Sequence, residues 1–216
     1  MPQLLWGGVA GPILFATVAT LCAWLRPGYS QIHQFISELG ATGTANAWLM
    51  NGAGFVPGGL LIAGFGLALR DALPRRRLFA AGSLLVVVFG AGIGASGLIP
   101  CDVGCPQGTG SAMNRVHDRL GPLLFLAGAL GAIVLGLGFR GVRTLRALWG
   151  YSVASGLIAL VLLALLASTL ETRVRTGLWQ RLLVATLFAW CAVVAIRVAR
   201  RGAASPDAAG PRQGTT

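Results

Sequence analysis

Six long apolar runs occupy most of this chain, and they constrain its fold more than any other feature. At about 1.5 Å per residue in a helix, each run is long enough to cross a hydrocarbon layer of about 30 Å. Only the sixth contains a charged residue, Arg181, which lies in the first turn and can reach the membrane interface. The runs are Leu4–Leu25, Ala47–Leu69, Leu78–Ile99, Leu120–Phe139, Ala147–Ser168 and Leu178–Ile196.

The composition favours six membrane-spanning helices and excludes an ordinary soluble domain. Of the 216 residues, 55% are hydrophobic and 11% are charged, and the mean hydropathy is +0.75. We therefore predict an all-α, six-helix integral membrane domain over residues 1–201, followed by a disordered tail at 202–216. The first run has no basic residues before it, so we interpret it as a membrane helix rather than a signal peptide.

Small residues in these runs predict close helix packing. GxxxG spacings begin at Gly7, Gly54 and Gly90, and such spacings let two helices approach closely. Pro12 and Pro57 are expected to kink the first two helices, because proline removes a helical hydrogen bond.

The charged residues separate according to the connection in which they lie. The chain has no lysine, and 11 of its 17 basic residues follow the second, fourth and sixth runs. The positive-inside rule therefore predicts that both termini lie in the cytoplasm and that the protein spans the cytoplasmic membrane several times. The net charge of +11 is explained by orientation and by contact with anionic membrane lipids, not by nucleic acid. The opposite side receives four of the six carboxylates and both histidines: Glu38, Asp102, Asp118, Glu171, His33 and His117.

The first connection is predicted to contain a short helix from Ser30 to Gly40 that lies at the membrane interface. Ser30 can cap its start, and Gly40 can end it. Its apolar residues fall on one face at helical spacing, which suits an interfacial helix. On its other face two polar pairs are expected at i,i+4, namely His33 with Ser37 and Gln34 with Glu38.

Two cysteines four residues apart follow the third run. Cys101 and Cys105 lie in a Gly- and Pro-containing turn on the predicted outer side, where a disulfide is chemically permitted. Zinc binding, with His33 or His117 as further ligands, is the competing interpretation. Cys22 and Cys191 lie within apolar runs and are expected to be packing residues.

The fourth run is preceded by a polar stretch that continues it as a helix. Asn114, His117, Asp118 and Gly121 follow one helical face, which we expect to point into the bundle. His117 beside Asp118 could act as a general base or a metal ligand. The alternative is a polar mouth in which histidines bond to carboxylates and the arginines at 26, 115 and 119 neutralise these carboxylates.

Three motifs on the predicted outer side resemble those of a family of prokaryotic membrane proteins, domain of unknown function 998. They are Arg26-Pro-Gly-Tyr-Ser30 followed by Ile36-Ser-Glu-Leu-Gly40, the turn Pro100-Cys-Asp-Val-Gly-Cys-Pro106, and His117 leading into the next helix. The resemblance covers about Leu4 to Ile196. It implies a six-helix membrane protein with a polar outer end, and it supplies no reaction or catalytic residue.

The sequence contains no complete catalytic motif, so we predict a protein that binds or senses a lipid or small amphiphile at an outer polar mouth. Two alternatives stay open. One is a hydrolase of a lipid ester or amide, with His117, Asp118, Ser37 and Glu38 as catalytic candidates, and zinc as its metal. The other is a small proton-coupled transporter that uses the Asp and His groups. Zinc ligands would come from His33, Glu38, Asp102, His117 and Asp118, and the expected binding residues are Arg26, Tyr29, His33, Ser37, Glu38, Asp102, Asn114, His117 and Asp118.

Overall fold

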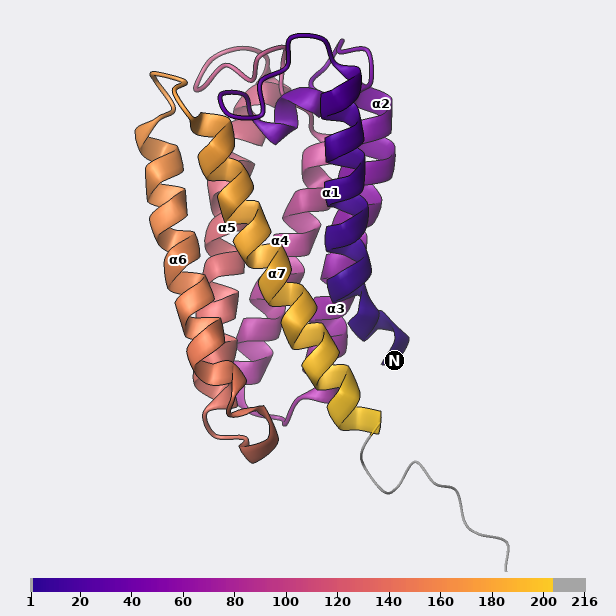
Figure 1. The fold of residues 1–216 in the computed structure, drawn as a ribbon, viewed down its shortest axis with the longest axis vertical. Coiled ribbons are helices and arrows are strands. Elements are labelled where there is room, and N and C mark those ends of the chain that lie inside the picture. Colours follow the sequence, from indigo (N-terminus) through magenta and orange to yellow (C-terminus); the bar gives the residue numbers. More distant parts are fainter. Residues whose placement is uncertain (1, 204–216) are drawn as a thin grey trace, which may run out of the picture.

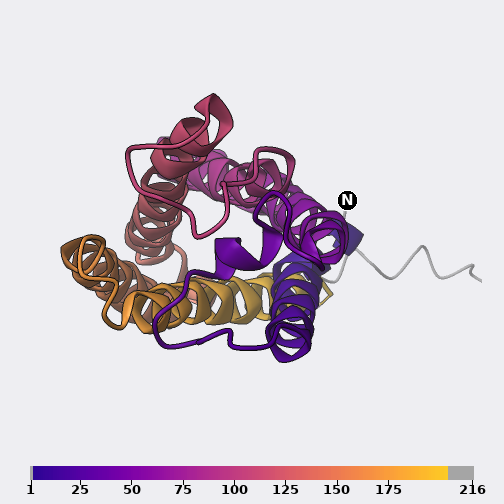
Figure 2. The ribbon, with the colours of Figure 1, turned by 90° about the horizontal axis from the view of Figure 1, so that it is seen from above.

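Six long helices pack side by side in chain order and close into a ring in the computed structural model, which describes residues 2–203 (Figures 1 and 2). Each helix packs against the next along the chain, and the last packs against the first. All six crossings are long and apolar enough to span a membrane, as predicted, and the described residues contain no strand. The helices are α1 (Gly7–Leu25), α3 (Val56–Ala72), α4 (Arg77–Leu98), α5 (Ala112–Phe139), α6 (Leu148–Ser168) and α7 (Thr176–Ala203).

Shorter elements extend or connect these helices. A 3-10 turn, η1 (Pro2–Trp6), precedes α1, and η4 (Arg143–Leu145) lies between α5 and α6. The second crossing runs from Ala47 to Ala72, because α2 (Ala47–Leu49) and the π-helical turn η3 (Met50–Phe55) lead directly into α3. Of the predicted tail, Gly202 and Ala203 belong to α7, and residues 204–216 lie outside the described range.

Exposed tryptophans mark both ends of the bundle. Trp24 and Trp48 are 81% and 73% exposed near one end, while Trp6 and Trp149 are exposed near the other. Tryptophan is enriched where a membrane meets water, because its ring is apolar and its N–H is polar. Together with the apolar crossings, these two belts indicate a multi-pass membrane protein.

Glycine residues let the backbones of α3 and α4 approach closely. A Cβ atom on Gly90 would lie 2.3 Å from the backbone nitrogen of Ala63, and one on Gly59 would lie 2.6 Å from the carbonyl oxygen of Gly90. A side chain at either position would overlap the neighbouring backbone, so the predicted close packing at the Gly90–Gly94 spacing is confirmed. The π-helical turn ends just before Pro57. Proline has no N–H to donate to the carbonyl of Ala53, four residues earlier, and Ala53 lies within this wider turn.

The fourth of these six helices in chain order, α5, begins earlier than its apolar run. Its first residue is Ala112 rather than Leu120, and the hydroxyl oxygen of Ser111 caps it by accepting the N–H of Asn114 at 3.1 Å. Asn114 and His117 are buried, whereas Arg115 and Arg119 are exposed. The predicted polar face of this helix therefore points inward.

The predicted helix from Ser30 to Gly40 is wrong in its first half. Residues 31–34 form turns, Phe35 is extended, and only Ile36–Gly40 is helical, as the 3-10 helix η2. The cause is Glu38, whose carboxylate turns back and accepts the N–H of Phe35 at 3.0 Å, so that the helix restarts there. The pair of Gln34 with Glu38 forms at 2.8 Å. His33 is bonded elsewhere and does not pair with Ser37.

Candidate functional site

Three connections meet at one end of the ring, which we call the polar end. They are residues 26–46 between α1 and α2, residues 99–111 between α4 and α5, and residues 169–175 between α6 and α7. Seen from above, the short helix η2 lies within the outline of the ring (Figure 2). The first connection therefore covers the ring, and the other two hold it in place.

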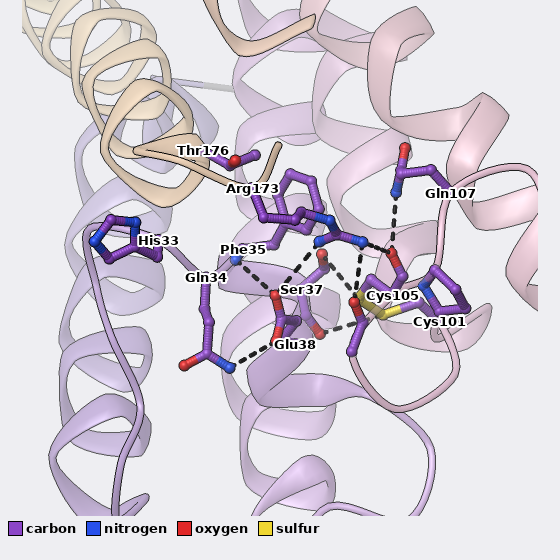
Figure 3. Close-up of polar contacts among 12 residues, drawn as sticks. His33, Gln34, Phe35, Ser37, Glu38, Cys101, Cys105, Gln107, Arg173 and Thr176 are labelled. Atoms are coloured by element: carbon purple, nitrogen blue, oxygen red, sulfur yellow. Dashed lines mark hydrogen bonds and ion pairs between the residues drawn. A yellow bond between two sulfur atoms is a disulfide. The ribbon is translucent and has the colours of Figure 1, made fainter. Parts of the chain in front are cut away.

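Glu38 organises this cover from within. Its side chain is 5% exposed, and its two carboxylate oxygens accept the N–H of Phe35 and the side-chain amide of Gln34. Its backbone carbonyl accepts a hydrogen bond from Arg26. A buried carboxylate needs such donors, because its loss of water is otherwise costly. Both carboxylate oxygens and the backbone carbonyl of the predicted site residue Glu38 therefore stabilise the first connection (Figure 3).

Arg173 joins the three connections. Its guanidinium lies 3.8 Å from the Glu38 carboxylate and 4.7 Å from the centre of the Phe35 ring. Its Nη2 atom donates to the carbonyl oxygens of Cys105 at 2.6 Å and Gly104 at 3.2 Å (Figure 3). One side chain from residues 169–175, the fifth connection, therefore holds both the first connection (26–46) and the third (99–111).

A second arginine, Arg181 at the start of α7, holds the beginning of the first connection. It donates to the carbonyl oxygens of Gln34 and Gly177 and, at 2.6 Å, to the phenolic oxygen of Tyr29. Arg26 also lies over the Tyr29 ring. Burial raises the pKa of the Tyr29 phenol, and the nearby Arg181 charge opposes that rise. Tyr29 stays protonated and donates to the carbonyl of Phe35 at 2.7 Å.

The third connection is held by the carboxylate of Asp102. It accepts both the N–H and the hydroxyl of Ser111, at 2.7 and 2.8 Å. These hydrogen bonds lower the pKa of Asp102, because they favour its charged form. Asn114 is fully buried and donates to the carbonyls of Pro106 and Thr109, while its oxygen accepts the N–H of Asp102.

Asp118 also bonds to this connection. It accepts the N–H of Gly108 at 2.9 Å and the side-chain amide of Gln107 at 3.3 Å. Like Asp102, it therefore has a structural task that accounts for a carboxylate at this position. Its side chain nevertheless lines a cavity, together with His117.

His117 presents one ring nitrogen to the protein. Its Nδ1 atom lies 2.7 Å from the carbonyl oxygen of Ile99. A carbonyl oxygen can only accept, so Nδ1 carries the proton and the neutral ring leaves Nε2 as an acceptor. Nε2 has no hydrogen-bond partner among the described residues. It is therefore a free acceptor in the cavity beside Asp118.

The cavity beside His117 has a volume of about 160 Å³ and lies between α5, α6 and α7. Its wall is mostly apolar, and its rim is polar. The polar rim consists of Ser37, Gln107, His117, Asp118 and Gln180, and the apolar wall consists of Phe35, Gly121, Pro122, Phe125, Leu163, Leu166, Ala167 and Leu170. Such a combination suits a ligand that is apolar along its length and polar at one end.

The other predicted site residues are not all gathered here. His33 is exposed, and its Nδ1 atom accepts the backbone N–H of Arg175 at 3.2 Å. Figure 3 shows its ring turned away from the Glu38 carboxylate. Within residues 2–203, no three histidine, cysteine or acidic side chains are placed to hold a metal ion. Of the five predicted zinc ligands, His33 and His117 each bond to a different backbone segment, and the three carboxylates accept hydrogen bonds that shape the connections.

Cys101 and Cys105 are at the distance of a disulfide bond, with their Cα atoms 5.1 Å apart, as predicted. The pair is buried against the first connection, where the hydroxyl of Ser37 lies 3.5 Å from the sulfur of Cys105 (Figure 3). Cys22 and Cys191 are free and buried, as expected of packing residues.

Residues 9–197 match the family model described as protein of unknown function (DUF998). The chain belongs to this family. No curated protein and no solved structure matches the chain. In this DUF998 protein, the two motifs of the first connection and the Cys-containing turn meet at the polar end, and His117 lies beneath them.

Sequence reasoning missed the residues that come from the fifth connection and the start of α7. No sequence pattern pointed to Arg173 or Gln180, and Arg181 was expected only to reach the membrane interface. Gln180 accepts the N–H of Ile36 at 2.7 Å and reaches the cavity rim. The available signal was the group of three arginines at positions 173, 175 and 181, because closely spaced cations require nearby acceptors.

Proposed function

We propose that the polar end of this DUF998 protein binds a lipid or small amphiphile. The observation that supports this proposal is the cavity beside His117, which has an apolar wall and a polar rim. At about 160 Å³ it is smaller than the cavities that enclose whole drug-sized ligands, so it suits one end of a single-chain amphiphile. The rest of the chain would extend along the apolar outer surfaces of α5 and α6.

The rim favours a headgroup that donates hydrogen bonds. Nε2 of His117 can only accept in the neutral ring, and the carboxylate of Asp118 also accepts. The Ser37 hydroxyl can do either. A hydroxyl or amide headgroup matches these groups better than a phosphate, whose oxygens would face the Asp118 charge.

The orientation of the site follows from the distribution of arginines. The connections at the opposite end carry more of them, so we propose that the polar end is extracytoplasmic and that the membrane is the cytoplasmic one. Single cysteines introduced at Thr42 and Arg76 test this orientation in intact cells. Only Thr42→Cys should react with an impermeant thiol reagent, and the opposite pattern would reverse the topology.

Binding is tested with a monoacylglycerol, a single-chain amphiphile with a hydroxylated head, added to purified protein and followed by native mass spectrometry. His117→Asn keeps an N–H near the position of Nδ1 for the Ile99 carbonyl but removes Nε2. We expect it to weaken binding about tenfold, which corresponds to one lost hydrogen bond to a buried group. Ala167→Leu should fill part of the cavity, while Ala164→Leu, on the same helix but outside the lining, is the matched control.

Equal binding by wild type, His117→Asn and Ala167→Leu would contradict the proposal. The circular dichroism spectrum of each variant verifies that it is folded. Loss of binding in Ala164→Leu as well would show that a bulkier α6 surface, and not the cavity, governs association.

A metal-dependent hydrolase is the second candidate, and one observation favours it. An unprotonated Nε2 beside a carboxylate is what a general base or a zinc ligand requires. Elemental analysis of purified wild type and His117→Ala separates the two functions. Stoichiometric zinc that is lost in His117→Ala would replace the binding proposal with the hydrolase.

A further inference from the structure

A second cavity lies on the other side of the first connection, between α1 and α7. Its volume is about 160 Å³, and its lining differs from that of the cavity beside His117. Small and apolar side chains form its length, including Ala16, Ala19, Ala185 and Phe188. Arg181 and Gln31 lie at its polar end. We call it the α1–α7 groove.

Arg181 keeps donors available in this groove. A guanidinium has five N–H groups in a fixed plane. Three hydrogen bonds are formed by Arg181, to the carbonyls of Gln34 and Gly177 and to the phenol of Tyr29. Two N–H groups therefore have no partner among the described residues. These contacts also fix the side chain, so little rotational freedom is lost when another acceptor binds.

The charge around Arg181 is not balanced by the described part of the chain. Within residues 2–203, no carboxylate lies within 4 Å of the guanidinium of Arg181 or of Arg26, and both arginines lie over the ring of Tyr29. The carboxylate of Glu38 is already bound by two donors and paired with Arg173. Two positive charges therefore share one partly buried place with no carboxylate of residues 2–203 in direct contact.

We infer that the α1–α7 groove binds an anionic phospholipid, with one acyl chain along the groove and the phosphate on Arg181. A phosphate presents several oxygens in the geometry that a guanidinium binds, and it supplies the missing negative charge. The apolar length of the groove, open at the outer surface of the bundle, matches an acyl chain. This site is separate from the cavity beside His117 and does not depend on the function proposed there.

The test compares two lipids that have identical acyl chains. Purified protein is delipidated and titrated with phosphatidylglycerol or phosphatidylcholine in native mass spectrometry. Wild type should retain phosphatidylglycerol in preference to phosphatidylcholine. Arg181→Gln should reduce phosphatidylglycerol affinity about tenfold, as expected when a charge-assisted contact is lost. It should reduce phosphatidylcholine affinity less, because the choline cation opposes the pairing of the same phosphate with arginine. Arg175→Gln is the matched control, because Arg175 is exposed and immediately precedes the same helix.

A second variant leaves Arg181 and its contacts intact. Ala185 is exposed within the groove, so Ala185→Leu should block the acyl chain without disturbing the core. Ala164→Leu adds the same bulk outside the groove and should have no effect. The inference is overturned if wild type binds both lipids equally, or if Arg181→Gln and Ala185→Leu bind phosphatidylglycerol as well as their controls do.

Discussion

Glu38 offers the most direct test of how the polar end is held together. Replacement by glutamine keeps the size of the side chain and removes its charge. The carboxylate now accepts from Phe35 and Gln34 through two oxygens, whereas an amide has only one oxygen. One donor would lose its acceptor inside a site where the side chain is 5% exposed.

The expected cost follows from these contacts. A buried donor without an acceptor costs about 1–3 kcal/mol. The ion pair with Arg173 adds at most about 1 kcal/mol, because Arg173 is one-third exposed and 3.8 Å away. The total of about 1–4 kcal/mol corresponds to a fall in Tm of about 2–16 °C for a chain of this length.

Two native cysteines allow unfolding to be measured. Cys22 and Cys191 are free and buried, so a thiol-reactive fluorophore reports their exposure as the protein unfolds on heating. Glu171→Gln is the control, since Glu171 is exposed in the fifth connection and its replacement should change stability by less than about 0.5 kcal/mol. If Glu38→Gln lowers Tm no more than Glu171→Gln does, the carboxylate does not organise the polar end and the argument fails.

Three further changes probe other parts of the fold. Gly90→Ala should destabilise the protein by about 1–3 kcal/mol, because its Cβ would overlap the α3 backbone, whereas Gly150→Ala, where nothing lies within 4 Å, should be neutral in the same thermal assay. Replacing Cys101 and Cys105 together by serine should cost about 2 kcal/mol, the loop-closure value for so short a loop, and circular dichroism melts should show that a reductant affects wild type but not this variant. The lowered pKa of Asp102 means that its contribution is complete above the ordinary aspartate pKa of about 4 and is lost as pH falls through the lower folded value. The protection of the amides of residues 99–111 from hydrogen exchange, measured against their intrinsic exchange rates, should therefore fall at acidic pH in wild type, and Asp102→Asn should remove this pH dependence.

The six crossings could be predicted because hydropathy is a property of each segment alone. The start of α5 shows where this signal ends. Residues 112–119 contain several charged groups, yet they are helical because Ser111 caps them and Asn114 bonds to the preceding connection. The first connection shows the reverse error. The apolar residues from Ser30 onward do have helical spacing. However, the carboxylate of Glu38 accepts the N–H of Phe35, so the helix begins only at Ile36.

The sequence predicts where the site lies but not the contacts that build it. Its position followed from the side on which carboxylates and histidines gather. The contacts of Arg173 and Arg181 could not be predicted, because most of their acceptors are backbone carbonyls, many of them far away along the chain. Backbone carbonyls occur at every residue and leave no pattern in a sequence.

The structure also divides the polar groups into those already used and those still free. Glu38, Asp102 and Asp118 had been considered as catalytic or metal-binding groups, but each accepts hydrogen bonds that shape a connection. Among the groups still free are an acceptor at Nε2 of His117 in one cavity and N–H donors of Arg181 in the other. An acceptor selects ligands that donate, and a cationic donor selects anions. The two cavities have similar volumes and both are lined mainly by apolar side chains, so the difference at their polar ends separates their ligands.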